Sequence, residues 1–164
     1  MTSISVHLWF DHQAAEAVAF YTSTFEDSEV YSDVTFHDGG PNHDQDVHII
    51  DFRIGDMRLS AFNGGPHSEF NEAISLAVVC DDQEEVDRYW KALTADGGRE
   101  VMCGWLRDRF GVSWQIIPSG LNDLLADPDP ARARKAMVAM LAMKRIVLAD
   151  IEAVMDQPDQ TPPD

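Results

Sequence analysis

The segment that begins at Glu16 resembles the segment that begins at Glu85, and this internal repeat restricts the fold more than any other feature of the chain. In the comparison, Phe20 and Tyr21 fall on Tyr89 and Trp90. Each segment has the spacing of an amphipathic helix, follows a strand-like run and precedes further strand-like runs. A repeated supersecondary unit is the usual cause of such self-similarity. The sequence therefore predicts two modules with the same order of elements.

The pattern of apolar residues sets the expected elements. Alternation predicts strands at 4–10, 29–36, 47–54, 57–62 and 73–80, and several short strands between 100 and 117. The three- and four-residue spacing predicts helices at 13–25 and 82–95. We expect an α+β fold with modules at about 1–63 and 71–118 in one domain, 1–118.

After Pro118 the chain becomes helical in character. The run Asp127-Pro128-Asp129-Pro130 offers an Asp cap followed by Pro at the first helical position, twice over. We expect a C-terminal helical extension at 119–157 and a disordered tail at 158–164. A helix at 131–144 should bury Ala133, Met137, Met140 and Leu141, and a shorter helix should hold Ile151, Val154 and Met155. The Met-rich helix is expected to cover the sheet edge or to contact a second subunit.

Charge and cysteine content restrict the partners and the compartment. The formal net charge is −17, so the surface repels nucleic-acid phosphates and anionic membranes, and we expect neither as a partner. No apolar run reaches about 18 residues, so no membrane span is expected. Cys80 and Cys103 are isolated thiols outside any CxxC motif, which favours a reducing cytoplasm.

Four stretches carry a family resemblance: LWFDHQAAEAVAFYTSTFEDS, FNGGPHSEFNEAISLAVVCDDQEEVDRYWKAL, CGWLRDRFGVSWQIIP and the tail segment KAMVAMLAMKRI. Together they resemble the PhnB-like branch of the glyoxalase, bleomycin-resistance and extradiol-dioxygenase superfamily, also called vicinal oxygen chelate. The resemblance implies two βαβββ modules whose sheets curl into a half-barrel, with ligand or metal on the concave face. It also implies a homodimer, to which the C-terminal tail should contribute.

Members of this branch often carry the label 3-demethylubiquinone-9 3-methyltransferase. The sequence does not support methyl transfer, because it contains no Gly-rich strand-to-helix turn of the kind that cradles a nucleoside cofactor. We therefore expect no cofactor.

The resemblance also locates the positions at which metal-dependent relatives place His and Glu ligands. Counting from Gly111 puts Gln115 at the last ligand position, where a neutral amide is a poor ligand for a divalent transition metal. His7 lies one or two residues from the first ligand position, and one imidazole does not make a metal site. We expect no metal at the usual positions. The other three positions fall on Ser75 or a neighbouring aliphatic residue, on Ser60 or Ala61, and on Val6 or Ser5.

The candidate ligand-binding residues are those expected on the concave face and its rim. Gln115 interrupts an otherwise apolar strand, and its amide needs solvent, a structural partner or a ligand. His7 is a candidate general base or a structural histidine. Cys103 as a nucleophile would need a basic partner, which the sequence does not identify. The face should carry His7, Trp9, Ser113 and Gln115, and the rim Asn63, His67, Cys103 and Trp105.

Two functions follow from this face. The first is binding of a small, partly aromatic or apolar molecule without metal, with Trp9 and Trp105 lining the site. The competing interpretation of these aromatic residues is that they belong to the core or to a dimer interface. The second function is an enzyme of the lyase, isomerase or dioxygenase type, using an atypical metal near His7 or metal-free acid–base chemistry.

Overall fold

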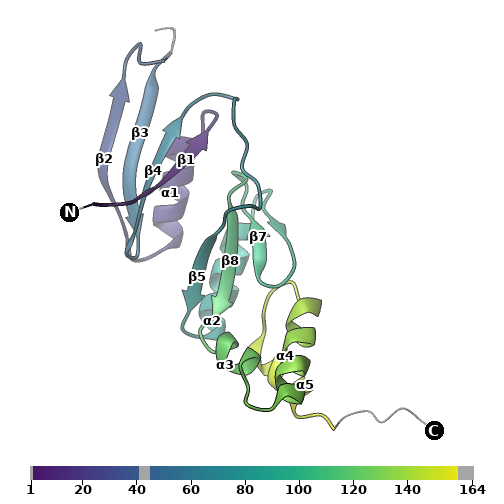
Figure 1. The fold of residues 1–164 in the computed structure, drawn as a ribbon. Coiled ribbons are helices and arrows are strands. Elements are labelled where there is room, and N and C mark those ends of the chain that lie inside the picture. Colours follow the sequence, from purple (N-terminus) through teal and green to yellow (C-terminus); the bar gives the residue numbers. More distant parts are fainter. Residues whose placement is uncertain (1, 41–44, 159–164) are drawn as a thin grey trace. The chain divides into compact units, whose positions relative to one another are not determined.

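In the computed structural model, residues 2–40 and 45–158 are described, and the chain divides between Phe70 and Asn71 into two compact units (Figure 1). Each unit contains one four-stranded mixed sheet and a long helix between its first and second strands. The α+β class and the repeated strand–helix–three-strand order are therefore confirmed. Apart from Pro158, the predicted disordered tail lies outside the described residues.

Unit 1 ends at Phe70 and holds the first sheet. Its strand order is β1-β4-β3-β2, with β1 parallel to β4 and the other neighbours antiparallel. The two edge strands are therefore β1 and β2, and β1 lies next to β4, the last strand of the unit in sequence. The elements are β1 (Val6–Phe10), α1 (Ala14–Thr24), β2 (Ser28–Phe36), β3 (Val47–Ile54) and β4 (Met57–Asn63).

Helix α1 packs on one face of the first sheet, so each side chain of the sheet points either toward this helix or away from it. Tyr21 of α1 is buried and stacks on Phe52 of β3 with ring centroids 6.3 Å apart. Phe52 pairs with Leu59, which in turn pairs with Val6, so these residues point to the helix. Because side chains alternate along a strand, His7, Ser60 and Asp51 point away from it. We call the face of each sheet that points away from its long helix the open face.

Unit 2 begins at Asn71 and repeats this arrangement in the order β5-β8-β7-β6. Asp82 caps α2 by accepting a hydrogen bond from the Glu85 backbone amide, and Trp114 and Ile116 of β8 are buried on the helix side. The match to unit 1 includes the parallel pairing of first and last strands. The elements are β5 (Leu76–Cys80), α2 (Gln83–Thr94), β6 (Arg99–Glu100), β7 (Trp105–Arg107) and β8 (Ser113–Pro118).

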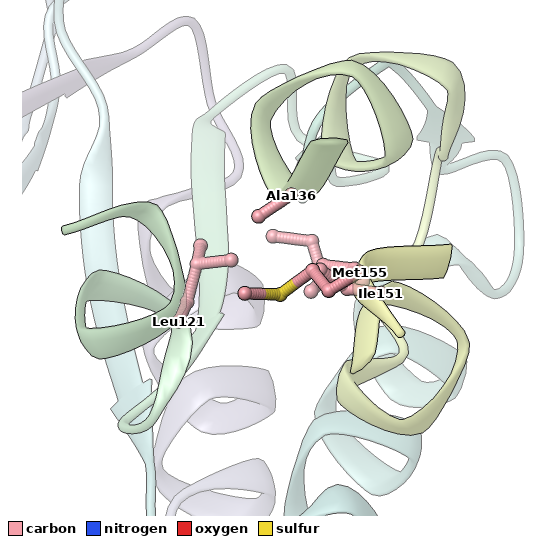
Figure 2. Close-up of a cluster of buried hydrophobic side chains, with 5 residues drawn as sticks. Leu121, Ala136, Ile151 and Met155 are labelled. Atoms are coloured by element: carbon pink, nitrogen blue, oxygen red, sulfur yellow. The ribbon is translucent and has the colours of Figure 1, made fainter. Parts of the chain in front are cut away.

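The C-terminal extension folds as three helices of unit 2 with a small core of their own. They are α3 (Leu121–Leu125), α4 (Pro130–Ala142) and α5 (Leu148–Met155). Figure 2 shows side chains from all three converging: Leu121, Ala136, Ile151 and Met155, which belong to one buried cluster with Ile146. Asp129 accepts a hydrogen bond from the Ala131 amide, as expected for an Asp-Pro helix start. The short helix α3 was not predicted.

The predicted buried face of α4 is partly wrong. Met137 and Leu141 are 41% and 53% exposed, whereas Ala136, which we did not include, is fully buried. Every position from 136 to 143 is apolar, so the spacing alone does not choose one stripe of the helix over another. The packing of α3 and α5 makes that choice through Ala136 and Met140.

The segment between α4 and α5 is fastened to the sheet and to α2. The backbone amides of Cys103 and Gly104 donate to the carbonyl oxygens of Met143 and Lys144, at 2.8 and 2.7 Å. The Gln83 amide donates to the Ile146 carbonyl at 3.1 Å. These bonds hold the extension in a fixed place on unit 2. No helix in the described part of the chain is both long enough and apolar enough to span a membrane.

Candidate functional site

A cavity of about 310 Å³ lies on the open face of the second sheet. We call it the sheet cavity. The sheet contributes Val79, Trp105, Gln115 and Ile117 to its wall, and the turn before β7 contributes Cys103. The extension supplies the other side with Leu121, Asn122, Met140 and Ile146. A volume of this size suits a small organic molecule.

Gln115 lies in this wall, and the nitrogen of its side-chain amide already has a hydrogen-bond partner. As predicted, it points to the face opposite Trp114, which is 1% exposed. Its Nε2 donates to the Ser75 hydroxyl at 2.8 Å, and no described residue donates to its Oε1. An amide oxygen accepts two hydrogen bonds, so the Gln115 oxygen is available to a molecule in the cavity.

Trp105 pairs directly with Gln115 across β7 and β8 and is half-buried. The indole N–H groups of Trp9, Trp90 and Trp114 donate to Gly65, Glu100 and Asp108, respectively. The indole of Trp105 has no acceptor among the described residues, so the cavity wall presents one donor beside one acceptor.

Cys103 stands in an unusual backbone conformation at the cavity wall. Its φ is +58°, a region that residues other than glycine adopt rarely and at a cost of about 1–3 kcal/mol. The thiol is free, half-buried and 3.9 Å from the Leu141 carbonyl oxygen. The other free thiol, Cys80, is fully buried, and burial raises its pKa to about 12. Of the two thiols, only Cys103 lies in the cavity wall.

Ser113, the remaining candidate of unit 2, is 3% exposed and donates to the Asn71 carbonyl oxygen at 3.3 Å. Its hydroxyl has a structural partner, and Ser113 does not belong to the cavity wall. The structure therefore brings Cys103, Trp105 and Gln115 together and leaves Ser113 outside.

The open face of the first sheet carries a polar row of residues on neighbouring strands. Ser60 of β4 pairs with His7 of β1 on one side and with Asp51 of β3 on the other. Ser60 is 2% exposed, and its Oγ has no hydrogen-bond partner among the described residues. His7 is exposed and Asp51 is half-buried. The row combines an imidazole, a buried hydroxyl and a carboxylate.

The other three candidates of unit 1 gather around the turn after β4. The Trp9 indole donates to the Gly65 carbonyl at 2.8 Å and packs so closely on Gly64 that a Cβ there would overlap it. Asn63 Oδ1 accepts a hydrogen bond from the Ala14 amide at 2.9 Å, where α1 begins. His67 is exposed. Trp9 and Asn63 therefore have structural contacts of their own, and their ligand-binding role stays a prediction.

The donor groups at the expected ligand positions do not suit a divalent transition metal. His7 pairs with Ser60, and the equivalent pair in unit 2 is Ala77 with Gln115. These positions supply one imidazole, one hydroxyl, one methyl and one neutral amide. The count that put Val6 at the first position is wrong, because Val6 shares the helix side with Leu59. Within residues 2–40 and 45–158, no three His, Cys, Asp or Glu side chains are grouped so as to hold a metal.

Sequence reasoning missed the half of the cavity that the extension provides. Leu121, Asn122, Met140 and Ile146 lie beyond the strand pattern, and their periodicity gives no information about where the extension packs. At Gly104 a Cβ would lie 2.8 Å from the Ile146 side chain, but a glycine in the sequence does not specify which segment packs against it.

A family model described as 3-demethylubiquinone-9 3-methyltransferase matches residues 2–117. A putative 3-demethylubiquinone-9 3-methyltransferase, the PhnB protein of Bacillus cereus, is 29% identical, with a TM-score of 0.63 over 71% of this chain and 99% of that one. No curated protein matches the chain. The family match ends at 117, so α3, α4 and α5 lie outside it.

Two more distant structures share the fold. A Pseudomonas aeruginosa protein is 22% identical, with a TM-score of 0.60 over 72% of this chain and 98% of that one. The fosfomycin resistance protein FosX of Listeria monocytogenes is 15% identical, with a TM-score of 0.55 over 74% of this chain and 94% of that one. These likenesses support the glyoxalase and bleomycin-resistance fold.

Proposed function

The chain belongs to the 3-demethylubiquinone-9 3-methyltransferase family, the PhnB-like branch of the vicinal oxygen chelate superfamily, and we propose that it binds a small, partly apolar molecule in the sheet cavity. Binding would use no metal at the positions where metal-dependent relatives hold one. The observation that carries the proposal is the meeting of Trp105, Gln115 and Cys103 in one wall, because an apolar pocket with a few polar groups is the usual form of a small-molecule site.

The proposal is tested with indole as a probe, followed in ¹H–¹⁵N spectra of the full chain. We expect saturable shifts of the Trp105 indole and Gln115 side-chain amide resonances, while the Trp9 indole, which is bonded to Gly65, stays in place. Protein alkylated at Cys103 with N-ethylmaleimide is the matched control, since the adduct occupies the wall of the cavity. Shifts confined to residues of unit 1, or unchanged binding after alkylation, would contradict the proposal.

A second candidate function is metal-free acid–base catalysis on the open face of the first sheet. The buried Ser60 hydroxyl, unpartnered among the described residues, lies between His7 and Asp51 and favours it. A histidine is suited to proton transfer near neutral pH. In D₂O, the protein should then catalyse exchange of the hydrogens next to the carbonyl of hydroxyacetone for deuterium. His7→Gln should abolish this exchange. An exchange rate equal to that of buffer removes this candidate.

An atypical metal centre at His7 makes a separate prediction. Metal analysis of untagged protein would find a stoichiometric transition metal that His7→Ala removes. The direct neighbour of His7 across β1 and β4 is the hydroxyl of Ser60, a poor ligand for a transition metal, which argues for the opposite result, namely no bound metal in either protein.

We do not extend the methyltransferase description of the family to this chain. The connection from β1 to α1 contains Asp11, and the connection from β5 to α2 contains Asp81 and Asp82. Asp82 itself caps α2, so a carboxylate stands where a bound anion would need backbone N–H groups. S-Adenosylmethionine should therefore leave the melting temperature unchanged, and a rise that saturates with concentration would reverse this conclusion.

The chain is also proposed to form a cytoplasmic homodimer through α4. Met137, Val138 and Leu141 form an exposed apolar stripe on this helix, beside Arg134. A second copy of a chain with net charge −17 offers carboxylates to that arginine. Unpaired Cys80 and Cys103 suit a reducing compartment. Light scattering should give a dimer mass that Val138→Asp converts to a monomer, with Ala149→Asp as the control on exposed α5 surface.

A further inference from the structure

Among the residues that the structure describes, the wall of the sheet cavity contains no charged side chain. Its polar members are the amides of Gln115 and Asn122, the hydroxyl of Ser119 and the thiol of Cys103, and the remaining members are apolar or aromatic. Charged residues make up 25% of this chain, so an uncharged wall differs from its composition. A charged ligand would lose its hydration here without gaining a counter-charge.

Two cations that precede a wall residue in sequence are already paired with carboxylates. Lys144 and Arg145 immediately precede Ile146, which lies in the cavity wall. Lys144 pairs with Glu100 at 3.3 Å, and Arg145 pairs with Asp87. These two ion pairs attach the extension to unit 2 and leave no unpaired cation on this segment for an anionic ligand.

The hydrogen-bonding groups that remain in the wall specify a complementary ligand. Gln115 presents an oxygen that accepts, and its cross-strand neighbour Trp105 presents an N–H that donates. A ligand that satisfies both needs one donor and one acceptor on the same edge, as a carboxamide or lactam has. The indole face of Trp105 and the side chains of Ile117 and Met140 suit a flat apolar group.

We propose that the ligand of the sheet cavity is an uncharged molecule in which an amide-like donor–acceptor group is joined to a flat apolar ring. This inference rests on the proposed function and adds the chemical class of the ligand. The extension supplies part of the apolar surface for the ring, because Met140 and Ile146 lie beyond the family match at residue 117.

Three probes of nearly equal shape separate the ligand's charge from its size. Benzamide is neutral, benzoate is an anion and benzamidine is a cation. Each is titrated into the full chain while the Trp105 indole and Gln115 amide resonances are followed. We expect benzamide to bind at least about tenfold more tightly than either ion, because neither ion finds a counter-charge in the cavity wall. A tenfold difference in affinity corresponds to about 1.4 kcal/mol of binding free energy.

The outcomes distinguish the two proposals. If benzoate or benzamidine binds as tightly as benzamide, the neutral ligand class is wrong and the cavity remains a binding site. If none of the three probes shifts these resonances and indole fails as well, the proposed function is wrong. Gln115→Glu provides a second measurement, because Glu has the same shape and can accept a hydrogen bond from Ser75. We expect it to reverse the preference toward benzamidine, and an unchanged order of affinities would overturn the inference.

Discussion

On the first sheet, the junction of the parallel strands β1 and β4 carries His7 beside Ser60, whereas the junction of β5 and β8 on the second sheet carries Ala77 beside Gln115. Both junctions belong to the same arrangement of elements, and both pairs point away from the long helix of their unit. The first pair lies in a row with the titratable Asp51. In the second pair, Gln115 lies in a neutral wall whose other half comes from the extension. A duplicated module therefore fixes where side chains point, and added elements determine what they surround.

The largest expected effect comes from the core of the extension, which distinguishes the second sheet from the first. Ile151→Ala should lower the free energy of unfolding by about 2–5 kcal/mol, because Ile151 is fully buried among Leu121, Ala136 and Met155. Glu152→Ala is the control, since Glu152 is exposed on the same helix and should change the value by less than about 0.5 kcal/mol. Urea denaturation measures both, and equal effects would mean that the extension has no packed core.

The two thiols of unit 2 sharpen the comparison between its helix side and its open face. Cys103 should react with Ellman's reagent in the native protein, whereas Cys80 should react only on unfolding, because burial raises its pKa to about 12. One thiol should therefore titrate rapidly and the second only in denaturant. Benzamide should slow the Cys103 reaction. Two fast thiols would show that β5 opens readily.

Gln115→Ala tests the second junction directly. It removes the hydrogen bond to Ser75 and should cost about 1 kcal/mol of stability. It should also weaken benzamide binding. Thermal and urea unfolding measure the first effect and NMR titration the second. If the variant keeps its full stability but loses benzamide binding, Gln115 contributes to ligand binding and not to stability.

Ser60→Ala is the matched change at the first junction and should have the opposite sign. The Ser60 hydroxyl is buried without a partner among the described residues, so its removal should leave stability unchanged or raise it by up to about 1 kcal/mol. A loss comparable to that of Gln115→Ala would indicate that the hydroxyl has a partner in solution.

The smallest effect concerns the attachment of the extension at Glu100. Hydrogen bonds from Trp90 and Lys144 lower the pKa of this carboxyl group. Its stabilisation is therefore present above the ordinary value of 4.5 and is lost as the pH falls through the lowered pKa. Wild type and Glu100→Gln should differ in urea midpoint at pH 7, and the difference should disappear as the pH falls through the lowered pKa. A difference that grows on acidification would contradict the sign.

The fold was predictable from sequence to within a few residues, because strand alternation and helix spacing are local properties. The paired aromatic residues Tyr21 and Trp90 located the two long helices, and both are buried as the repeat requires. The missed helix α3 is only five residues long. The error at Met137 has a different cause: an apolar helix offers several stripes, and only its neighbours select one.

The candidate site was predictable in part. The face of Gln115 followed from alternation, and Trp105 and Cys103 were expected at the rim. The contribution of Met140 and Ile146 was not predictable, because it depends on backbone hydrogen bonds such as Cys103 to Met143 between segments far apart in sequence. Whether His7 and Gln115 serve one ligand stays a prediction.

The extension residues in the cavity wall differ in how freely they can be substituted. Leu121 and Ile146 belong to the buried core of the extension, so changing them alters folding together with the cavity. Ser119 and Asn122 are exposed elsewhere on their surface and lie outside that core, yet both border the cavity. Mutations at these two positions can change which molecule is preferred while leaving the folded state intact. The extension thus gives the second sheet an adjustable region in which new specificities can be selected in the laboratory at little cost in stability.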